Sequence, residues 1–182
     1  MTDLTGKRVA FVATNGFEDS ELFDPWTAVT SSGATAVLVS TEAGTITGKN
    51  GGEAEVGVTT AEADAGDYDA LVLPGGVVNS DDIRLDADAV ALVKALVTAA
   101  KPVGVICHGA WILADADVLR GRTITSFPTL RTDLTNAGAT WVDEEVVCDQ
   151  GLVSSRTPKD LPAFNDKLVE EIAEGVHPQR EA

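Results

Sequence analysis

The segment from Val103 to Trp111 reads "VGVICHGAW" and carries the residues best suited to covalent chemistry. An apolar run ends at Cys107, His108 follows it, and residues 108–119 have the apolar spacing of a helix. A cysteine at a strand-to-helix turn lies at the carboxyl edge of a parallel sheet, where the helix N-terminus favours its thiolate. The segment therefore predicts that Cys107 is a nucleophile. The alternative is an inert, buried cysteine.

A pair of acidic residues, Glu18 and Asp19, follows the first apolar run in "VATNGFEDSEL" (12–22). At the start of a helix such a pair ordinarily complements the helix dipole, and the residues alone favour this interpretation. The functional hypothesis is that one carboxyl group reaches across the strand ends to the cysteine.

The segment "LVLPGG" (71–76) ends a third apolar run in a Pro-Gly-Gly turn. The turn could simply reverse the chain. Because Gly75 and Gly76 have no side chains, they could also bring backbone N–H groups close to an anion, as an oxyanion hole requires.

The remaining motifs favour no metal and no cofactor. Two histidines and two cysteines without CxxC or HxxxH spacing disfavour a zinc site, and no GxGxxG follows the first strand. The segment 44–50, "GTITGKN", does not have the spacing of a phosphate-binding loop, and we interpret its glycine and lysine residues as part of a hairpin. We expect Cys148 to be structural or semi-exposed and His177 to be a solvated surface residue.

The elements that must position these residues alternate between strands and helices. The predicted strands are near-continuous apolar runs, which are typical of a parallel sheet covered on both faces. They are residues 8–14, 35–40, 68–76, 101–106 and 151–155. Apolar residues at helical spacing predict three helices between these strands, including the one at 108–119, and a fourth that opens at Asp160 as its N-cap. Segments 53–58 and 144–155 are predicted hairpin additions, so the fold class is a doubly wound α/β sheet.

The length and net charge of the chain limit the number of domains and the classes of partner that it can have. The 182 residues (18.9 kDa) fit one domain spanning residues 1–182. The formal net charge of -16 argues against nucleic acid and anionic membranes as partners. With no signal-like or membrane-length apolar run, we expect a cytoplasmic protein whose two cysteines are reduced.

Several of these motifs together resemble the PfpI-like intracellular protease family of the DJ-1 superfamily. The matching segments include "NGFEDSEL", "GTITGKNG", "YDALVLPGG", "KPVGVICHGAWIL" and "LVSSRTPKDLPAFN". The resemblance implies a flavodoxin-like three-layer α/β sandwich with a mostly parallel central sheet. It also implies homodimers, and hexamers in some members.

The resemblance also assigns roles to particular residues. Cys107 matches the nucleophile, Glu18 the carboxyl group that contacts its sulfur, and His108 the general base. Gly76, with Gly75 beside it, and the backbone N–H of His108 match the oxyanion-binding positions. Asp81 is nearest to the position of a glutamate that orients the histidine of a neighbouring subunit.

The implied substrates are all electrophilic carbonyls: peptides, small aldehydes such as methylglyoxal or glyoxal, and early glycation adducts of proteins. The leading hypothesis is a cofactor-free cysteine enzyme of stress protection, either a peptidase or a glyoxalase or deglycase type. The alternative is a redox-sensing or chaperone-like protein in which Cys107 is oxidised and catalysis is incidental.

Overall fold

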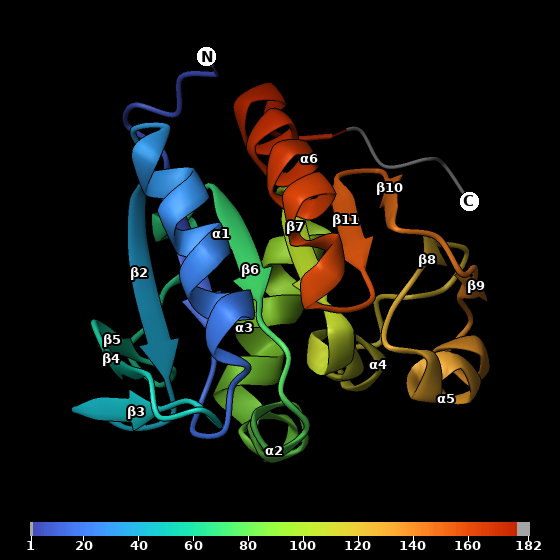
Figure 1. Ribbon diagram of the computed structural model, residues 1–182, viewed down its shortest axis with the longest axis horizontal. Helices are drawn as coiled ribbons and strands as arrows, with labels where there is room; N and C mark the ends of the chain where they lie inside the picture. Colours follow the sequence, from blue (N-terminus) through green and yellow to red (C-terminus); the bar gives the residue numbers. More distant parts are fainter. Residues whose placement is uncertain (1, 178–182) are drawn as a thin grey trace.

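The structure, a computed structural model, describes residues 2–177 and is built on a seven-stranded sheet of order β10-β11-β7-β6-β1-β2-β5 (Figure 1). The strands are β1 (Arg8–Val12), β2 (Thr35–Ser40), β5 (Val58–Thr59), β6 (Ala70–Leu73), β7 (Val103–Ile106), β10 (Val146–Asp149) and β11 (Leu152–Ser155). All pairs are parallel except β10 with β11. The residues of β6 and β7 are entirely buried, which explains their continuous apolar sequence.

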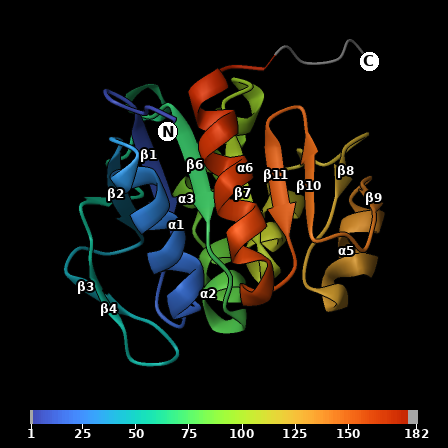
Figure 2. The ribbon, with the colours of Figure 1, turned by 45° about the horizontal axis from the view of Figure 1, so that its top comes forward.

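Helices cover both faces of this sheet (Figure 2). Helices α1 (Asp19–Ser31) and α6 (Leu161–Glu174) pack on one face through Leu22, Phe164 and other apolar side chains. Helix α3 (Ala87–Thr98) and the short α4 (Ile112–Asp115) pack on the other. The predicted mostly parallel, flavodoxin-like α/β sandwich is therefore confirmed.

Helices α1, α3 and α6 lie where the sequence predicts helices, with one difference in hydrogen bonding. Asp160 precedes α6 as expected, but its side chain does not cap the helix. Its carboxylate instead accepts hydrogen bonds from Arg156, at 2.9 Å from Nε and 3.0 Å from the backbone nitrogen. Asp160 is thus the N-cap residue as predicted, but its side chain makes no capping hydrogen bond because the Arg156 guanidinium binds its oxygens.

Smaller elements decorate the sheet. The predicted hairpins are present: β3 (Thr45–Thr47) pairs with β4 (Glu53–Glu55), and β10 pairs with β11. The sequence did not predict α2 (Val77–Asp82), α5 (Arg131–Asn136), β8 (Thr123–Ile124) or β9 (Thr140–Trp141). Each is six residues or shorter, too short for a clear periodic pattern. Across residues 2–177, no helix has the length and apolar character needed to cross a membrane.

Candidate active site

Cys107 lies at a sharp turn directly after β7. Its φ is +61°, in the left-handed region that non-glycine residues rarely adopt, and such strained residues cluster at functional sites. A 3₁₀ turn (Cys107–Trp111) follows, and the α-helical part ends at Asp115, so the helix is shorter than the predicted 108–119. A Cβ on Gly109 would collide with the carbonyl oxygens at the end of β6. The turn is thus packed tightly against the carboxyl end of the neighbouring strand.

His108 is buried beside Cys107. Its Nδ1 lies 3.3 Å from the Cys107 sulfur, and its Nε2 lies 3.3 Å from Oγ1 of Thr129. The imidazole stacks on Phe127, with ring centroids 4.6 Å apart and an interplanar angle of 25°. With Nε2 donating to the threonine hydroxyl, Nδ1 is free to accept the thiol proton.

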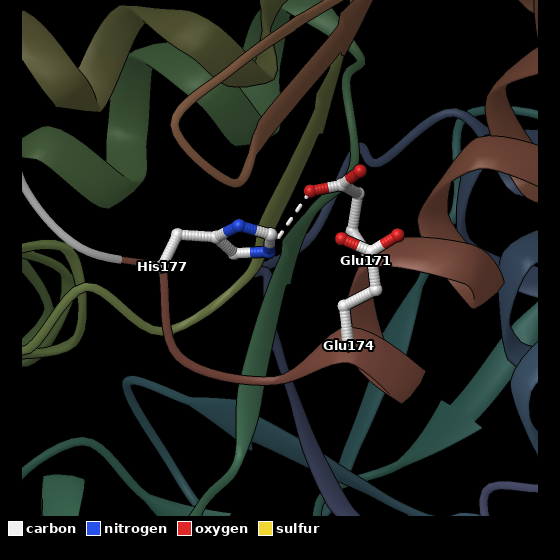
Figure 3. Close-up of side chains that lie close together, drawn as sticks. All are labelled: Glu171, Glu174 and His177. Atoms are coloured by element: carbon white, nitrogen blue, oxygen red, sulfur yellow. Dashed lines mark ion pairs between the residues drawn. The ribbon is translucent and has the colours of Figure 1, made fainter.

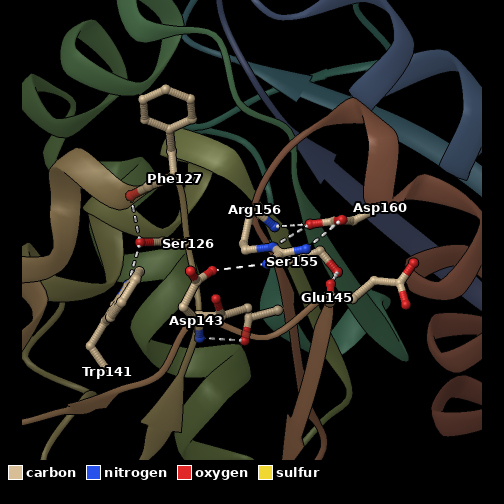
Figure 4. A network of polar contacts seen from close by, with 10 residues as sticks. Ser126, Phe127, Trp141, Asp143, Glu145, Ser155, Arg156 and Asp160 are labelled. Carbon is tan, nitrogen blue, oxygen red and sulfur yellow. Dashed lines mark hydrogen bonds and ion pairs between the residues drawn. The ribbon is translucent and has the colours of Figure 1, made fainter.

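A polar network holds the segment that carries Phe127 in place (Figure 4). Trp141 donates its indole N–H to Ser126 Oγ at 2.9 Å, and Ser126 in turn donates to the Phe127 carbonyl at 2.9 Å. Phe127 also donates its backbone N–H to the Cys107 carbonyl at 3.2 Å. The orientation of His108 therefore depends on a chain of contacts that extends to β9.

The carboxyl group at the sulfur belongs to Glu21, not to Glu18. Glu21 is fully buried, contacts the Cys107 thiol, and accepts the Gly75 N–H through Oε2 at 2.9 Å. Glu18 lies one turn earlier, forms an ion pair with Lys49, and accepts a hydrogen bond from Asn50 at 3.3 Å. The expectation that Glu18 contacts the sulfur is corrected on this geometry: Glu18, the N-cap residue of α1, faces the β3–β4 loop, whereas Glu21 in the first turn faces the sheet edge.

The glycine turn contributes one N–H to the sulfur, from Gly76. The Gly76 and His108 backbone N–H groups both donate to Cys107, whereas the Gly75 N–H is occupied by Glu21. Gly76 has a φ of +91°, and a Cβ there would collide with the backbone of residues 16–18. Of the three expected oxyanion donors, the geometry thus leaves two facing the nucleophile and assigns Gly75 to Glu21.

Asn79 is a supporting residue that no sequence pattern indicated. It is 1% exposed, and its Oδ1 accepts the Thr14 N–H at 2.7 Å. Its Nδ2 donates to the carbonyls of Pro74 and Gly75, at 3.2 and 3.0 Å. One amide side chain therefore joins the end of β1 to the glycine turn, which positions the Gly76 N–H.

Burial controls protonation at the site. Burial, reinforced by the negative charge of Glu18, raises the pKa of Glu21 to about 8. Burial and the Glu21 charge raise the pKa of the Cys107 thiol to about 12, against the opposing N–H groups of His108 and Gly76. Burial, together with the nearby Lys49 charge, lowers the pKa of His108. At neutral pH the site therefore holds a thiol, a protonated carboxyl and a neutral imidazole that can act as base.

Asp81 does not contact His108 within one chain. Its side chain is 65% exposed on α2 and lies 4.0 Å from the Arg84 guanidinium. His108 meets a hydroxyl at its outer nitrogen instead of a carboxylate. Glu21, Cys107, His108 and Gly76 are brought together, and Asp81 is left on the surface.

Comparisons with known proteins show the family of this chain. Residues 7–171 match the DJ-1/PfpI family, and the chain belongs to that family. It is 44% identical over 162 residues to Deglycase PH1704 of Pyrococcus horikoshii, covering 89% of this chain and 97% of that protein. It is 42% identical over 160 residues to the putative cysteine protease YraA of Bacillus subtilis, covering 87% and 94%.

A solved structure shares the whole fold. It is a two-domain protein with DJ-1/ThiJ/PfpI-like and ferritin-like domains from Anabaena variabilis, with a TM-score of 0.89 and 32% identity. The match covers 97% of this chain and 52% of that one. The shared fold places this chain among the DJ-1/PfpI proteins over its full described length.

Proposed function

We propose that this protein is a cofactor-free cysteine enzyme of stress protection that acts on α-oxoaldehydes and their adducts with amines, as a glyoxalase or deglycase. The observation that carries the proposal is the buried set of Cys107, His108 and Glu21 at one strand end. The 44% identity to a deglycase over nearly its full length supports the same substrate class. The two free thiols of Cys107 and Cys148 fit the cytoplasm, where we place the enzyme.

The chemistry follows from the geometry of the nucleophile. The Cys107 sulfur attacks the aldehyde carbon while His108 Nδ1 takes the thiol proton, and the Gly76 and His108 N–H groups stabilise the oxyanion. A proton then moves between the two substrate carbons, which converts the hemithioacetal into a thioester. Water releases lactate and restores the thiol. The net reaction adds one water to methylglyoxal and needs no oxidant.

The wild-type protein is therefore expected to convert methylglyoxal to lactate and to release free amine from amino acids freshly glycated by methylglyoxal. Lactate is measured by coupled assay and the amine by chromatography, with a casein-type peptide in parallel. Buffer and heat-unfolded protein at the same concentration serve as controls. Lactate and amine release that do not exceed these controls would refute the proposed function.

Peptide hydrolysis is the second candidate, and Asp81 is the residue on which it depends. In one chain Asp81 is exposed, and so are the neighbouring apolar side chains Val77 (55%) and Val78 (57%) on α2. An exposed apolar pair beside the glycine turn fits coverage by a second copy of the chain. We propose a homodimer, or a hexamer built from dimers, in which Asp81 of one copy approaches His108 of the other.

Asp81→Asn is accordingly expected to lower kcat for peptide hydrolysis by about ten-fold or more and to leave KM nearly unchanged, because the carboxylate would only orient the base. Asp82→Asn, on the same helix, is the matched control. Oligomer mass is measured for each variant in the assay buffer. Peptide hydrolysis by Asp81→Asn at the wild-type rate, with the oligomer intact, would exclude this role.

Two observations disfavour the redox-sensing alternative. A sensor cysteine needs a low pKa and solvent access. Cys107 is only 9% exposed, and burial and Glu21 raise its pKa. The buried, protonated thiol fits a nucleophile that is activated by His108 when substrate binds.

A further inference from the structure

A second cluster of chemically capable side chains lies far from the nucleophile in the sequence, at the C-terminal end of α6. Figure 3 shows Glu171 and Glu174 on the last turn of the helix, with the imidazole of His177 facing them. One ligand atom from each residue lies within 4.8 Å of the other two. The sequence had predicted a solvated His177. That expectation was wrong, because the side chain is only 19% exposed and lies against Glu171.

The backbone explains how His177 reaches this position. Gly175, with a φ of +85°, ends α6 and reverses the chain, and His177 donates its N–H to the Ala100 carbonyl at 3.0 Å. The imidazole then passes over Gly151 in the β10–β11 turn, where a Cβ would collide with the ring. The ring is therefore held between two separate parts of the fold.

The contact between His177 and Glu171 does not have the geometry of a hydrogen bond. Nε2 lies 2.9 Å from Glu171 Oε2, yet this buried nitrogen has no hydrogen-bond partner among the described residues. The ring nitrogen therefore does not point at the oxygen beside it. The His177 nitrogen and the Glu171 oxygen thus lie close together without a hydrogen bond between them. Two ligand atoms of one metal ion have this arrangement, because each is directed at the ion.

Two neighbouring side chains contact the Glu171 carboxylate, the Lys167 ammonium and the Cys148 thiol. Lys167 binds Glu171 through the other oxygen, Oε1, at 2.7 Å, and also contacts Glu170 at 3.2 Å. Glu171 Oε2 therefore remains on the side of His177. Ligand atoms bound to one zinc ion stand about 3–4 Å apart, so a small rotation of the exposed Glu174 would complete the set.

We propose that Glu171, Glu174 and His177 form a binding site for a divalent cation of the Zn²⁺ class. One imidazole and two carboxylates suit such an ion, whereas Mg²⁺ and Ca²⁺ prefer oxygen ligands alone. The ion would tie the segment after α6 to the helix and so stabilise the fold. The site is separate from the chemistry at Cys107 and does not depend on the proposed function.

The test titrates ZnCl₂ into the full-length Cys107→Ser/Cys148→Ser protein by calorimetry. This background removes both thiols as zinc ligands, including Cys148, which contacts Glu171, so that any binding depends on the imidazole and the carboxylates. A large excess of Mg²⁺ suppresses weak binding to the acidic surface. One equivalent of Zn²⁺ is expected to bind. Because Glu171 is buried with Lys167, the variants are His177→Ala and the more exposed Glu174→Gln, and each is expected to lower the affinity about ten-fold or more.

Glu170→Gln, a carboxylate on the same helix outside the cluster, should bind Zn²⁺ as tightly as the background protein. As a second measurement, Zn²⁺ should raise the Tm of the background protein and not that of His177→Ala. Three outcomes would each overturn the site: no Zn²⁺ binding in excess Mg²⁺, affinities of His177→Ala and Glu174→Gln that equal that of the background protein, or a loss of affinity in Glu170→Gln as large as in these two variants.

Discussion

Cys107→Ser is expected to lower kcat/KM for methylglyoxal and glycated amines by about 10³-fold or more. A serine hydroxyl ionises far less readily than a thiol, and the site offers it only His108 as a base. The sulfur is the one atom that the Gly76 N–H, the His108 N–H and Glu21 all contact. A loss of this size corresponds to about 4 kcal/mol of transition-state stabilisation.

Cys148→Ser is the matched control, because it removes the other thiol from the exposed β10 strand. Its activity should remain within about two-fold of wild type, since surface substitutions rarely disturb a distant site. Circular dichroism and Tm show whether either variant is misfolded. A folded Cys107→Ser protein that retains a tenth of wild-type activity would exclude Cys107 as the nucleophile.

The sequence predicted the strand end and turn that hold Cys107 but could not identify all of the side chains around it. The strand and turn at Cys107 were predicted because an apolar run followed by a helical pattern is a local signal. Glu18 and Glu21 are three residues apart on α1, and both look like ordinary acidic residues at a helix start. Which of them faces the sulfur depends on how the helix is rotated against the sheet, and this is set by tertiary packing.

Other features depend on contacts between distant segments. Asn79 bonds to Thr14, 65 residues earlier in the chain, and so joins the end of β1 to the glycine turn; no local pattern distinguishes it from a surface asparagine. The position of His177 depends on Gly151 in the β10–β11 turn, because a side chain at that position would collide with the imidazole. The strands and long helices were predictable because their own periodicity encodes burial, whereas these polar contacts exist only in the folded chain.

Glu21→Gln is expected to change how stability depends on pH. Between about pH 4.5 and about pH 8 the folded wild type holds a proton on Glu21 that the unfolded chain has lost, because the native pKa is about 8. Raising the pH through this window therefore destabilises the wild type. Glutamine has no such proton, so the variant should not show this loss of stability. The free energy of unfolding of the variant minus that of the wild type should therefore rise by about 1.4 kcal/mol per pH unit in this window.

Denaturant unfolding at about pH 5.5 and about pH 7.5 measures this difference, and the expected relative gain is about 2–3 kcal/mol. Asp24→Asn, an exposed carboxylate on the same helix, should show no comparable change between the two pH values. If Glu21→Gln tracks wild type at both pH values, Glu21 is ionised in the folded protein and the protonated-carboxyl interpretation fails.

Activity separates the two candidate carboxyl groups. Glu21→Gln should lower kcat/KM about 10²-fold, because the buried group that contacts the sulfur and fixes the Gly75 N–H loses its exchangeable proton. Glu18→Gln removes a carboxylate that binds Lys49 at the edge of the site and should cost much less. A larger loss in Glu18→Gln than in Glu21→Gln would return the sulfur-contacting role to Glu18. The pH profile gives an independent check, because the profile of the Glu21 variant should lack the ionisation near pH 8 that Glu21 contributes in the wild type.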